Sequence, residues 1–126
     1  METLTKNFDF SEFESHDGTK MPESVKKNIR ELAQNLEVLR KYFNEPIHIN
    51  SGYRSEKHNR LIGGKPQSKH LLGQAADIVV NGKKPSEVAD AIEKLISQGK
   101  MKQGGLGRYK NFTHYDIRGY KARWKG

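Results

Sequence analysis

A histidine and an aspartate seven residues apart are the first side chains in the sequence that could do chemistry. His70 lies among small residues and glycine, and Asp77 runs directly into the apolar stretch Ile78–Val80. This pattern predicts a loop that carries the histidine and a strand that presents the aspartate. An imidazole nitrogen and a carboxylate oxygen are ordinary zinc ligands, and a catalytic zinc needs three protein ligands with the fourth position left to water. A third ligand must therefore come from elsewhere in the chain.

The best candidate for the third ligand is His114, in a hydrophobic and aromatic run bounded by glycines. Such a run predicts a strand, so the even-numbered residues of 112–118 should share one face, with His114 and Asp116 pointing the same way. The sequence contains no cysteine, which excludes disulfides and thiolate metal sites. A metal must then be held by nitrogen and oxygen, which suits a hydrolytic zinc. The predicted Zn²⁺ ligands are His70, Asp77 and His114.

Three motifs occur in order along the chain. Residues 51–55 are Ser-Gly-Tyr-Arg-Ser, residues 68–77 fit the pattern Ser-x-His-x-x-Gly-x-Ala-x-Asp, and His114 follows on its own strand. With these motifs the chain resembles the zinc D-Ala-D-Ala carboxypeptidases and related peptidoglycan peptidases, which share the hedgehog-type metal fold. The similarity extends from Phe8 to Trp124, nearly the whole chain. It implies that the protein hydrolyses the stem peptide of peptidoglycan with a bound zinc.

Four further residues have a possible role toward substrate. Arg54 falls at a strand-to-helix corner, where its planar guanidinium could bind a carboxylate such as the free C-terminus of a peptide, or could be tied to a structural acid. The resemblance implies the first role, that of the substrate-carboxylate anchor. Ser68 could donate a hydrogen bond to substrate or cap the loop before His70. Tyr53, like Arg118, could stabilise a developing oxyanion or pack in the interior.

The general base is where the sequence departs from the resembled family. Several relatives have an acid three positions before the last histidine, and some have a second histidine two positions before it. This chain has Asn111 and Phe112 there, and neither can accept a proton. Asp116 remains, either as the base or as a carboxylate that orients a ligating histidine. If Asp116 has neither role, Glu56 and His58 are the next candidates.

Hydrophobic periodicity predicts the elements that must position these residues. Pro22 and Glu23 start a helix whose apolar residues recur at steps of four and three up to Phe43. A second long helix runs from Pro85 to the residue before Gly99, and a short one follows Ser55 through residues 56–62. A helical turn is expected at Phe8, Phe10 and Phe13.

Strands are expected at residues 47–51, 78–80, 105–109, 112–117 and 123–124, the last three as consecutive antiparallel strands. His48 should point away from the core, and His16 should lie at the surface. The predicted fold class is therefore α+β: a mostly antiparallel sheet, two main helices and one short helix around a zinc cleft, in a single domain over residues 1–126.

Composition limits the possible functions. No apolar run approaches the roughly 20 residues of a membrane helix, and the N-terminus lacks the basic start and apolar stretch of a secretory signal. The formal net charge is +8, and residues 100–126 contain eight Lys or Arg against the single acid Asp116. Such a surface attracts polyanions, for example nucleic acid or an anionic bacterial envelope, or it simply keeps the protein in solution. We expect a monomer.

The leading hypothesis is zinc-dependent hydrolysis of an amide bond in the stem peptide, as a carboxypeptidase or an endopeptidase. A small basic chain without a signal resembles a phage or prophage lysis enzyme, made in the cytoplasm and acting on the wall after release. A second hypothesis is a non-catalytic, metal-containing wall-binding module, which the missing acid at Asn111 favours. A nucleic-acid binder, with steep salt dependence, has no use for the metal ligands, so the sequence argues against it.

Overall fold

Five strands form the sheet at the centre of the fold, in the order β3-β4-β6-β5-β7. The computed structural model describes residues 3–126. The strands are β3 (Ile47–Ser51), β4 (Ala75–Val80), β5 (Gly105–Arg108), β6 (Thr113–Asp116) and β7 (Ala122–Lys125). The first three neighbouring pairs are antiparallel, and β5 and β7 are parallel. The predicted α+β class with a mostly antiparallel sheet is confirmed.

The prediction of three consecutive antiparallel strands at the C-terminus is wrong for β7. This strand does not pair with β6 but lies on the other side of β5, at the sheet edge. The connecting segment crosses the start of β5, where the N–H groups of Gly119 and Ala122 donate to the carbonyls of Gln103 and Gly104. The chain therefore passes over the end of β5 instead of turning back beside β6.

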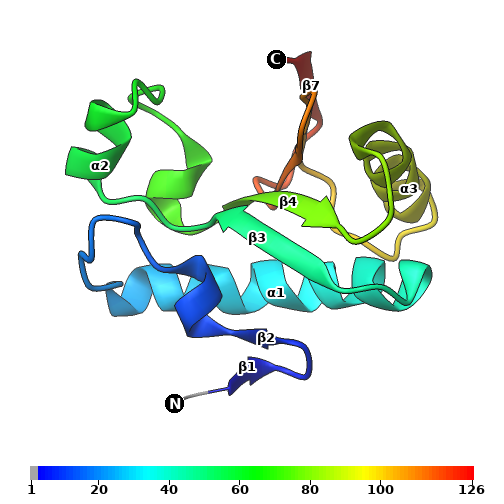
Figure 1. The fold of residues 1–126 in the computed structure, drawn as a ribbon, viewed down its shortest axis with the longest axis horizontal. Coiled ribbons are helices and arrows are strands. Elements are labelled where there is room, and N and C mark those ends of the chain that lie inside the picture. Colours follow the sequence, from blue (N-terminus) through cyan, green and yellow to red (C-terminus); the bar gives the residue numbers. More distant parts are fainter. Residues whose placement is uncertain (1–2) are drawn as a thin grey trace.

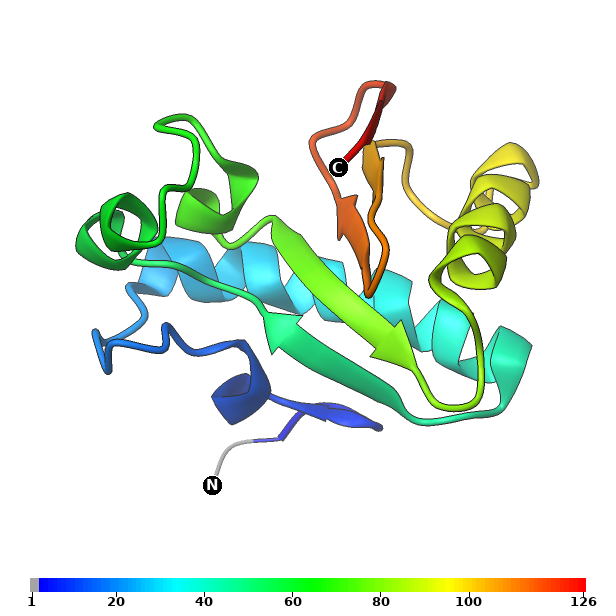
Figure 2. The same ribbon diagram turned by 45° about the horizontal axis from the view of Figure 1, so that its top comes forward.

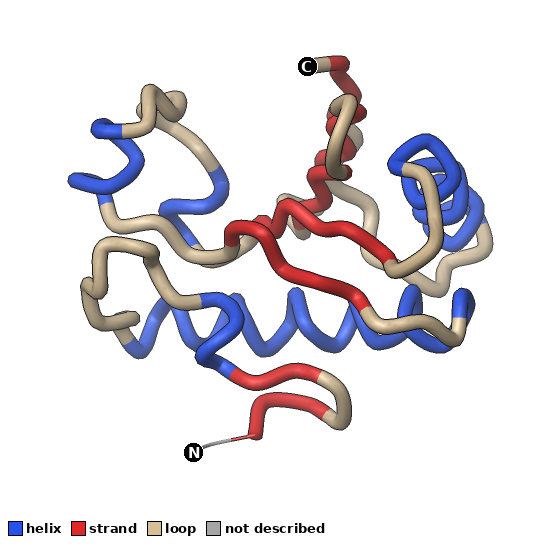
Figure 3. Tube along the Cα trace, viewed as in Figure 1, coloured by secondary structure: helices blue, strands red, loops and turns tan. Residues whose placement is uncertain are grey.

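Three helices and two short 3₁₀ turns surround the sheet. Figures 1 and 2 show α1 (Glu23–Phe43) running along the molecule, with α2 (Glu56–Leu61) near one end and α3 (Pro85–Ser97) near the other. The turns are η1 (Phe10–Phe13) and η2 (Lys69–Leu72). The chain begins with a small hairpin of β1 (Thr3–Thr5) and β2 (Phe8–Asp9), which was not predicted and contacts α1. Figure 3 shows the strands of the main sheet between α2 and α3.

Alternation along the strands gives the sheet one apolar face and one polar face. Ala76, Ile78 and Val80 of β4 pack with Tyr115 of β6 and with the apolar faces of α1 and α3. Asp77 on β4 and the even-numbered residues of β6 take the opposite face, because successive side chains of a strand alternate. Burial of each large apolar side chain on the helical face contributes roughly 1.5–3 kcal/mol. Packing of the helices on the apolar face therefore fixes the sheet, and with it the positions of the side chains on the open polar face.

One row of register partners crosses all five strands. Asp77 pairs with Ser51 on one side and with His114 on the other. Gly107 pairs in turn with His114 and with Trp124. Register partners lie close enough for their side chains to touch. The row on the open face therefore consists of Ser51, Asp77, His114, Gly107 and Trp124.

No helix among residues 3–126 is long and apolar enough to cross a membrane.

Candidate metal centre and cleft

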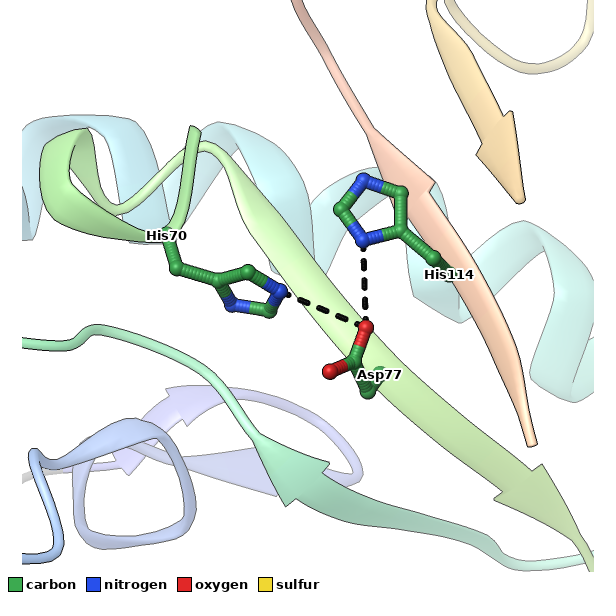
Figure 4. Close-up of side chains that lie close together, drawn as sticks. All are labelled: His70, Asp77 and His114. Atoms are coloured by element: carbon green, nitrogen blue, oxygen red, sulfur yellow. Dashed lines mark hydrogen bonds and ion pairs between the residues drawn. The ribbon is translucent and has the colours of Figure 1, made fainter. Parts of the chain in front are cut away.

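Three buried side chains direct donor atoms at one point on the open face (Figure 4). His70 comes from η2, Asp77 from β4 and His114 from β6. Asp77 Oδ1 lies 3.3 Å from His70 Nε2 and 3.1 Å from His114 Nδ1. All three ligand atoms lie within 4.8 Å of one another. The structure thus brings together the three residues that were predicted as metal ligands.

The capping of η2 positions His70. Ser68 is the N-cap, and its Oγ accepts a hydrogen bond from the His70 N–H at 3.2 Å. Gly73 ends the turn with φ +73°, and a side chain there would also meet Val25. The Arg54 N–H donates to the His70 carbonyl at 3.0 Å. Of the two roles considered for Ser68, the structure shows the loop cap.

Hydrogen bonds behind the two imidazoles fix which nitrogen of each faces Asp77. His70 Nδ1 lies 2.7 Å from the Gly52 carbonyl oxygen, which can only accept, so we assign the ring proton to Nδ1. His114 Nε2 lies 2.7 Å from Asp116 Oδ2, and we assign its proton there for the same reason. When both rings are neutral, a lone pair on His70 Nε2 and another on His114 Nδ1 are then left facing Asp77 Oδ1. Three electron-rich atoms without an intervening proton are the arrangement that a cation stabilises.

The spacing of these donor atoms fits zinc. Tetrahedral zinc with bonds of about 2.0–2.2 Å separates neighbouring ligand atoms by about 3.3–3.6 Å, and the two measured donor separations, 3.1 and 3.3 Å, lie at or just below the short end of that range. Nitrogen and carboxylate oxygen are also the ligand types that zinc accepts in hydrolytic sites. The residues present therefore fit the ion that the resemblance implies.

The surroundings of the two histidines shift their pKa values in opposite directions. Burial lowers the pKa of His70 below its usual 6.5, and its contact with Asp77 only partly offsets this. Burial also disfavours the charged form of His114, but the bonds to Asp116 and Asp77 outweigh it and raise its pKa above 6.5. His70 therefore favours the neutral form that a metal ligand must have, whereas His114 keeps a second ring proton more readily, and a metal would have to displace that proton.

Asp116 is fully buried and does not line the cleft. Its Oδ1 accepts from the Gly105 N–H at 2.9 Å and from Arg118 Nε at 2.8 Å, and its Oδ2 accepts from His114 Nε2 at 2.7 Å and Arg118 at 2.8 Å. Burial opposes ionisation, but these bonds hold the pKa of Asp116 far below its usual 3.8. A carboxylate so occupied has the geometry of a group that orients His114, as ligating histidines require.

Arg54 reaches the metal centre from the other side. Its guanidinium donates to Asp77 Oδ2 at 3.2 Å, to Ser51 Oγ at 3.2 Å and to Asn59 Oδ1 at 3.3 Å. A guanidinium has five N–H groups, so two remain for a substrate, and Arg54 lines the cleft. The acid to which Arg54 is tied is itself a candidate ligand. The two roles considered for Arg54 are therefore compatible in one side chain.

The metal centre lies in a cleft of about 480 Å³. Lys65, between α2 and η2, and Lys69, at the start of η2, contribute cations to its lining, and the strands β5 to β7 with their connections contribute aromatic rings. Asp77 is the single carboxylate among the lining residues from the described part of the chain. The lining residues used below are Arg54, Lys65, Lys69, Tyr109, Phe112, Arg118, Tyr120 and Trp124.

Other candidates from the sequence lie away from the metal centre. Tyr53 is buried and lines a neighbouring cavity together with Glu56. His58 faces His16, with ring centroids 5.7 Å apart. Asn111 is exposed. None of these three sites supplies a carboxylate or free imidazole to the cleft.

Sequence reasoning missed two parts of the cleft. Trp124 was assigned only to a strand, yet its ring lies 4.9 Å from that of His114. Lys65 and Lys69 were given no role. The sequence does contain a signal for the lysines, because Lys69 lies between Ser68 and His70 and Lys65 lies three positions before Ser68. Nothing local in the sequence places Trp124 beside a residue ten positions earlier on another strand.

Comparison with known proteins identifies the family of this chain. The sequence model of the peptidase M15 family matches residues 6–116, and the chain belongs to this family. The peptidase family indicated by the motifs is thereby confirmed. No curated protein matches the sequence. Among solved structures, the chain is similar to an L-Ala D-Glu endopeptidase of Serratia marcescens, with 18% identity over 79% of this chain and 90% of that one and a TM-score of 0.47.

Proposed function

We propose that this peptidase is zinc-dependent and hydrolyses an amide bond in the stem peptide of peptidoglycan, as a carboxypeptidase or an endopeptidase. The observation that carries the proposal is the convergence of His70 Nε2, Asp77 Oδ1 and His114 Nδ1 in a cleft. A zinc ion bound there would lower the pKa of its water to about 7 and polarise the scissile carbonyl.

The protein's own residues prepare the site for this chemistry. Gly52 and Asp116 orient the two imidazoles through hydrogen bonds of 2.7 Å each, so neither ring has to reorganise when metal binds. Arg54 uses its remaining N–H groups to hold a substrate carboxylate beside the metal. Asp116 supports His114 and does not act as the base, because all of its bonds are made inside the protein.

The charge of the cleft suits a stem peptide, which carries free carboxylates. The side chains of Lys65 and Lys69 have no carboxylate partner among residues 3–126, and the one lining carboxylate, Asp77, is held by Arg54 and the two histidines. An excess of unpaired positive charge in a cleft attracts and concentrates an anionic substrate.

A second candidate function is binding of peptidoglycan without hydrolysis. It is favoured by the cleft's lack of a free carboxylate that could act as a general base, since Asn111 stands where several relatives have an acid and is exposed. In that case the metal would hold substrate instead of activating water.

One assay separates the two functions. Purified peptidoglycan is incubated with the protein, with the chelated protein, and with the chelated protein after zinc is restored. The peptidase predicts release of amino groups that chelator abolishes and zinc restores, and the mass of the products identifies the bond. An Asp77→Ala variant serves as the inactive control. Sedimentation of the protein with peptidoglycan without any release of amino groups would replace the peptidase by the binding module.

A further inference from the structure

Four aromatic side chains form one side of the cleft, and we call them the aromatic wall: Tyr109, Phe112, Tyr120 and Trp124. Tyr109 and Phe112 are stacked, with ring centroids 4.4 Å apart and planes 31° apart. Trp124 Nε1 donates to the Tyr109 hydroxyl at 2.8 Å. The Arg118 guanidinium lies 5.3 Å from the Trp124 ring centre and 5.7 Å from that of Tyr120. These contacts join the four rings into one surface.

The aromatic wall is held in place and yet remains accessible. Gly107 leaves room for the indole of Trp124, because a Cβ at that position would approach Trp124 Nε1 to 2.5 Å. Tyr120 is nevertheless 58% exposed, and Tyr109, Phe112 and Trp124 are partly exposed. Exposed aromatic surface that is rimmed by polar groups marks a binding site. The wall therefore needs a ligand with an apolar face.

The stem peptide alone does not supply that face. Peptidoglycan stems consist mainly of alanine, acidic and diamino residues, so their side chains are methyl groups or charged groups. The same substrate has an N-acetylated sugar joined to the N-terminus of the peptide. A pyranose ring has an apolar C–H face, and its hydroxyls suit donors such as the Arg118 guanidinium and the tyrosine hydroxyls.

The contact between the aromatic wall and the metal centre narrows the choice of ligand. Trp124 contacts His114 directly, with 4.9 Å between ring centroids, so whatever covers the wall lies next to the scissile bond. We propose that the aromatic wall binds an N-acetylated sugar of the glycan strand to which the stem peptide is attached. This inference rests on the proposed peptidoglycan substrate and adds the glycan to the peptide. Tyr120 and Trp124 follow residue 116, where the family match ends.

A substrate pair that differs only in the sugar tests the inference. One peptide carries N-acetylmuramic acid at its N-terminus and the other carries only the lactyl group, so both have the same neutral amide. The parent protein should show a kcat/KM about 5- to 10-fold higher on the muramyl peptide, as expected for one ring-stacking contact. Tyr120→Ala should bring this ratio close to one, whereas Tyr120→Phe should retain it.

Tyr42→Ala is the matched control. Tyr42 is also an exposed tyrosine, at 45%, but it lies on α1 outside the cleft. This variant should keep the ratio of the parent. A parent ratio near one, or a ratio that Tyr120→Ala leaves unchanged, overturns the inference. Retention of the peptidase activity in that case leaves the proposed function standing.

A binding measurement separates the sugar from hydrolysis. Trp124 is the only tryptophan in the sequence, so all indole fluorescence reports the wall. A β-1,4-linked oligomer of N-acetylglucosamine should change the emission in a saturable way, with the change abolished by Tyr120→Ala and retained in Tyr42→Ala. A flat titration with an active peptidase refutes the sugar site. Saturation without any peptide cleavage supports the sugar site and contradicts the proposed hydrolysis of the stem peptide.

Discussion

Trp124 lies over Gly107, its register partner on the neighbouring strand, and reaches across that glycine to His114. Any side chain at Gly107 would occupy the position of the indole, since a Cβ there meets three ring atoms at 2.5–3.0 Å. The glycine is therefore required for close approach, and its φ angle plays no part.

The first prediction concerns this pair. Gly107→Ala should displace the indole, shift the fluorescence emission to longer wavelength and lower the free energy of unfolding by about 1–3 kcal/mol, as overpacking does. The same change in a Trp124→Ala background should cost much less, because the clash is gone. Denaturant unfolding followed by circular dichroism measures both. Additive costs in the double variant would show that Gly107 matters for another reason.

The second prediction concerns the metal. His70→Ala, Asp77→Ala and His114→Ala should each lose zinc, because two ligands do not hold the ion that three hold. Elemental analysis after dialysis gives the zinc content per chain. His48→Ala is the control, since His48 is an exposed histidine on β3. Full zinc occupancy in His114→Ala would contradict the assignment.

Asp116→Asn should weaken zinc binding about 10- to 100-fold, with activity restored in excess zinc. The neutral amide lacks the negative charge that supports His114, and whichever way it is turned, its NH₂ group faces N–H donors of Arg118 together with those of Gly105 or His114. A zinc titration of activity measures this. Asp90→Asn, at an exposed acid on α3, is the control. A rate loss of about 100-fold that persists at saturating zinc would instead make Asp116 the base.

Arg54→Ala should lower kcat/KM by about 10- to 150-fold on substrates that end in a free carboxylate, the cost of one charge-assisted contact. The same substrates with an amidated end should be affected much less, and this ratio separates substrate binding from the bonds of Arg54 to Asp77, Ser51 and Asn59. Arg60→Ala, at an exposed arginine on α2, is the control. Equal losses on both substrates would assign Arg54 a purely structural role.

The fifth prediction is a pH dependence at Asp17. Its carboxylate accepts hydrogen bonds from Ser55 Oγ at 2.6 Å, Ser15 Oγ at 2.8 Å and the Thr19 N–H at 3.1 Å, which hold its pKa well below the usual 3.8. A depressed pKa stabilises the fold above the unfolded value, and this stabilisation is lost as the pH falls through the folded value. Asp17→Asn should therefore be less stable than the parent near neutral pH.

The difference between the two proteins should narrow as the pH falls below about 4. Urea unfolding across that range measures it, and a difference that stays constant into strong acid would contradict the assignment. Ser55 also caps α2 directly after Arg54, so the bond to Asp17 holds the corner from which Arg54 reaches the cleft.

Local patterns predicted the parts of the site that depend on alternation and capping. The four-and-three spacing of α1 located the helix from Glu23 to Phe43, and the alternation of β6 placed His114 and Asp116 on one face. Ser55 and Ser68 are both observed as N-caps. These features were predictable because each depends on residues a few positions apart.

The order of strands in the sheet was not predictable in the same way. The β7 segment has the composition of a strand, but no local signal tells whether it pairs with β6 or crosses to β5. The position of Trp124 over Gly107 follows from that crossing. The bond between Arg54 and Asp77 joins residues 23 positions apart and depends on the same tertiary arrangement. Arg118 was predicted on the face of Asp116, and its pairing with that acid could have been inferred from the alternation.

The row of register partners through Asp77 and His114 makes the metal centre sensitive to strand alignment. A slip of β4 against β6 by one residue would turn an alternate set of side chains to the open face and separate the two ligands. Only the native alignment brings the proposed ligands together, so a bound ion would lower the population of every misaligned form by mass action. The ion proposed to activate water in the finished enzyme would thus also select, during folding, the sheet that can hold it.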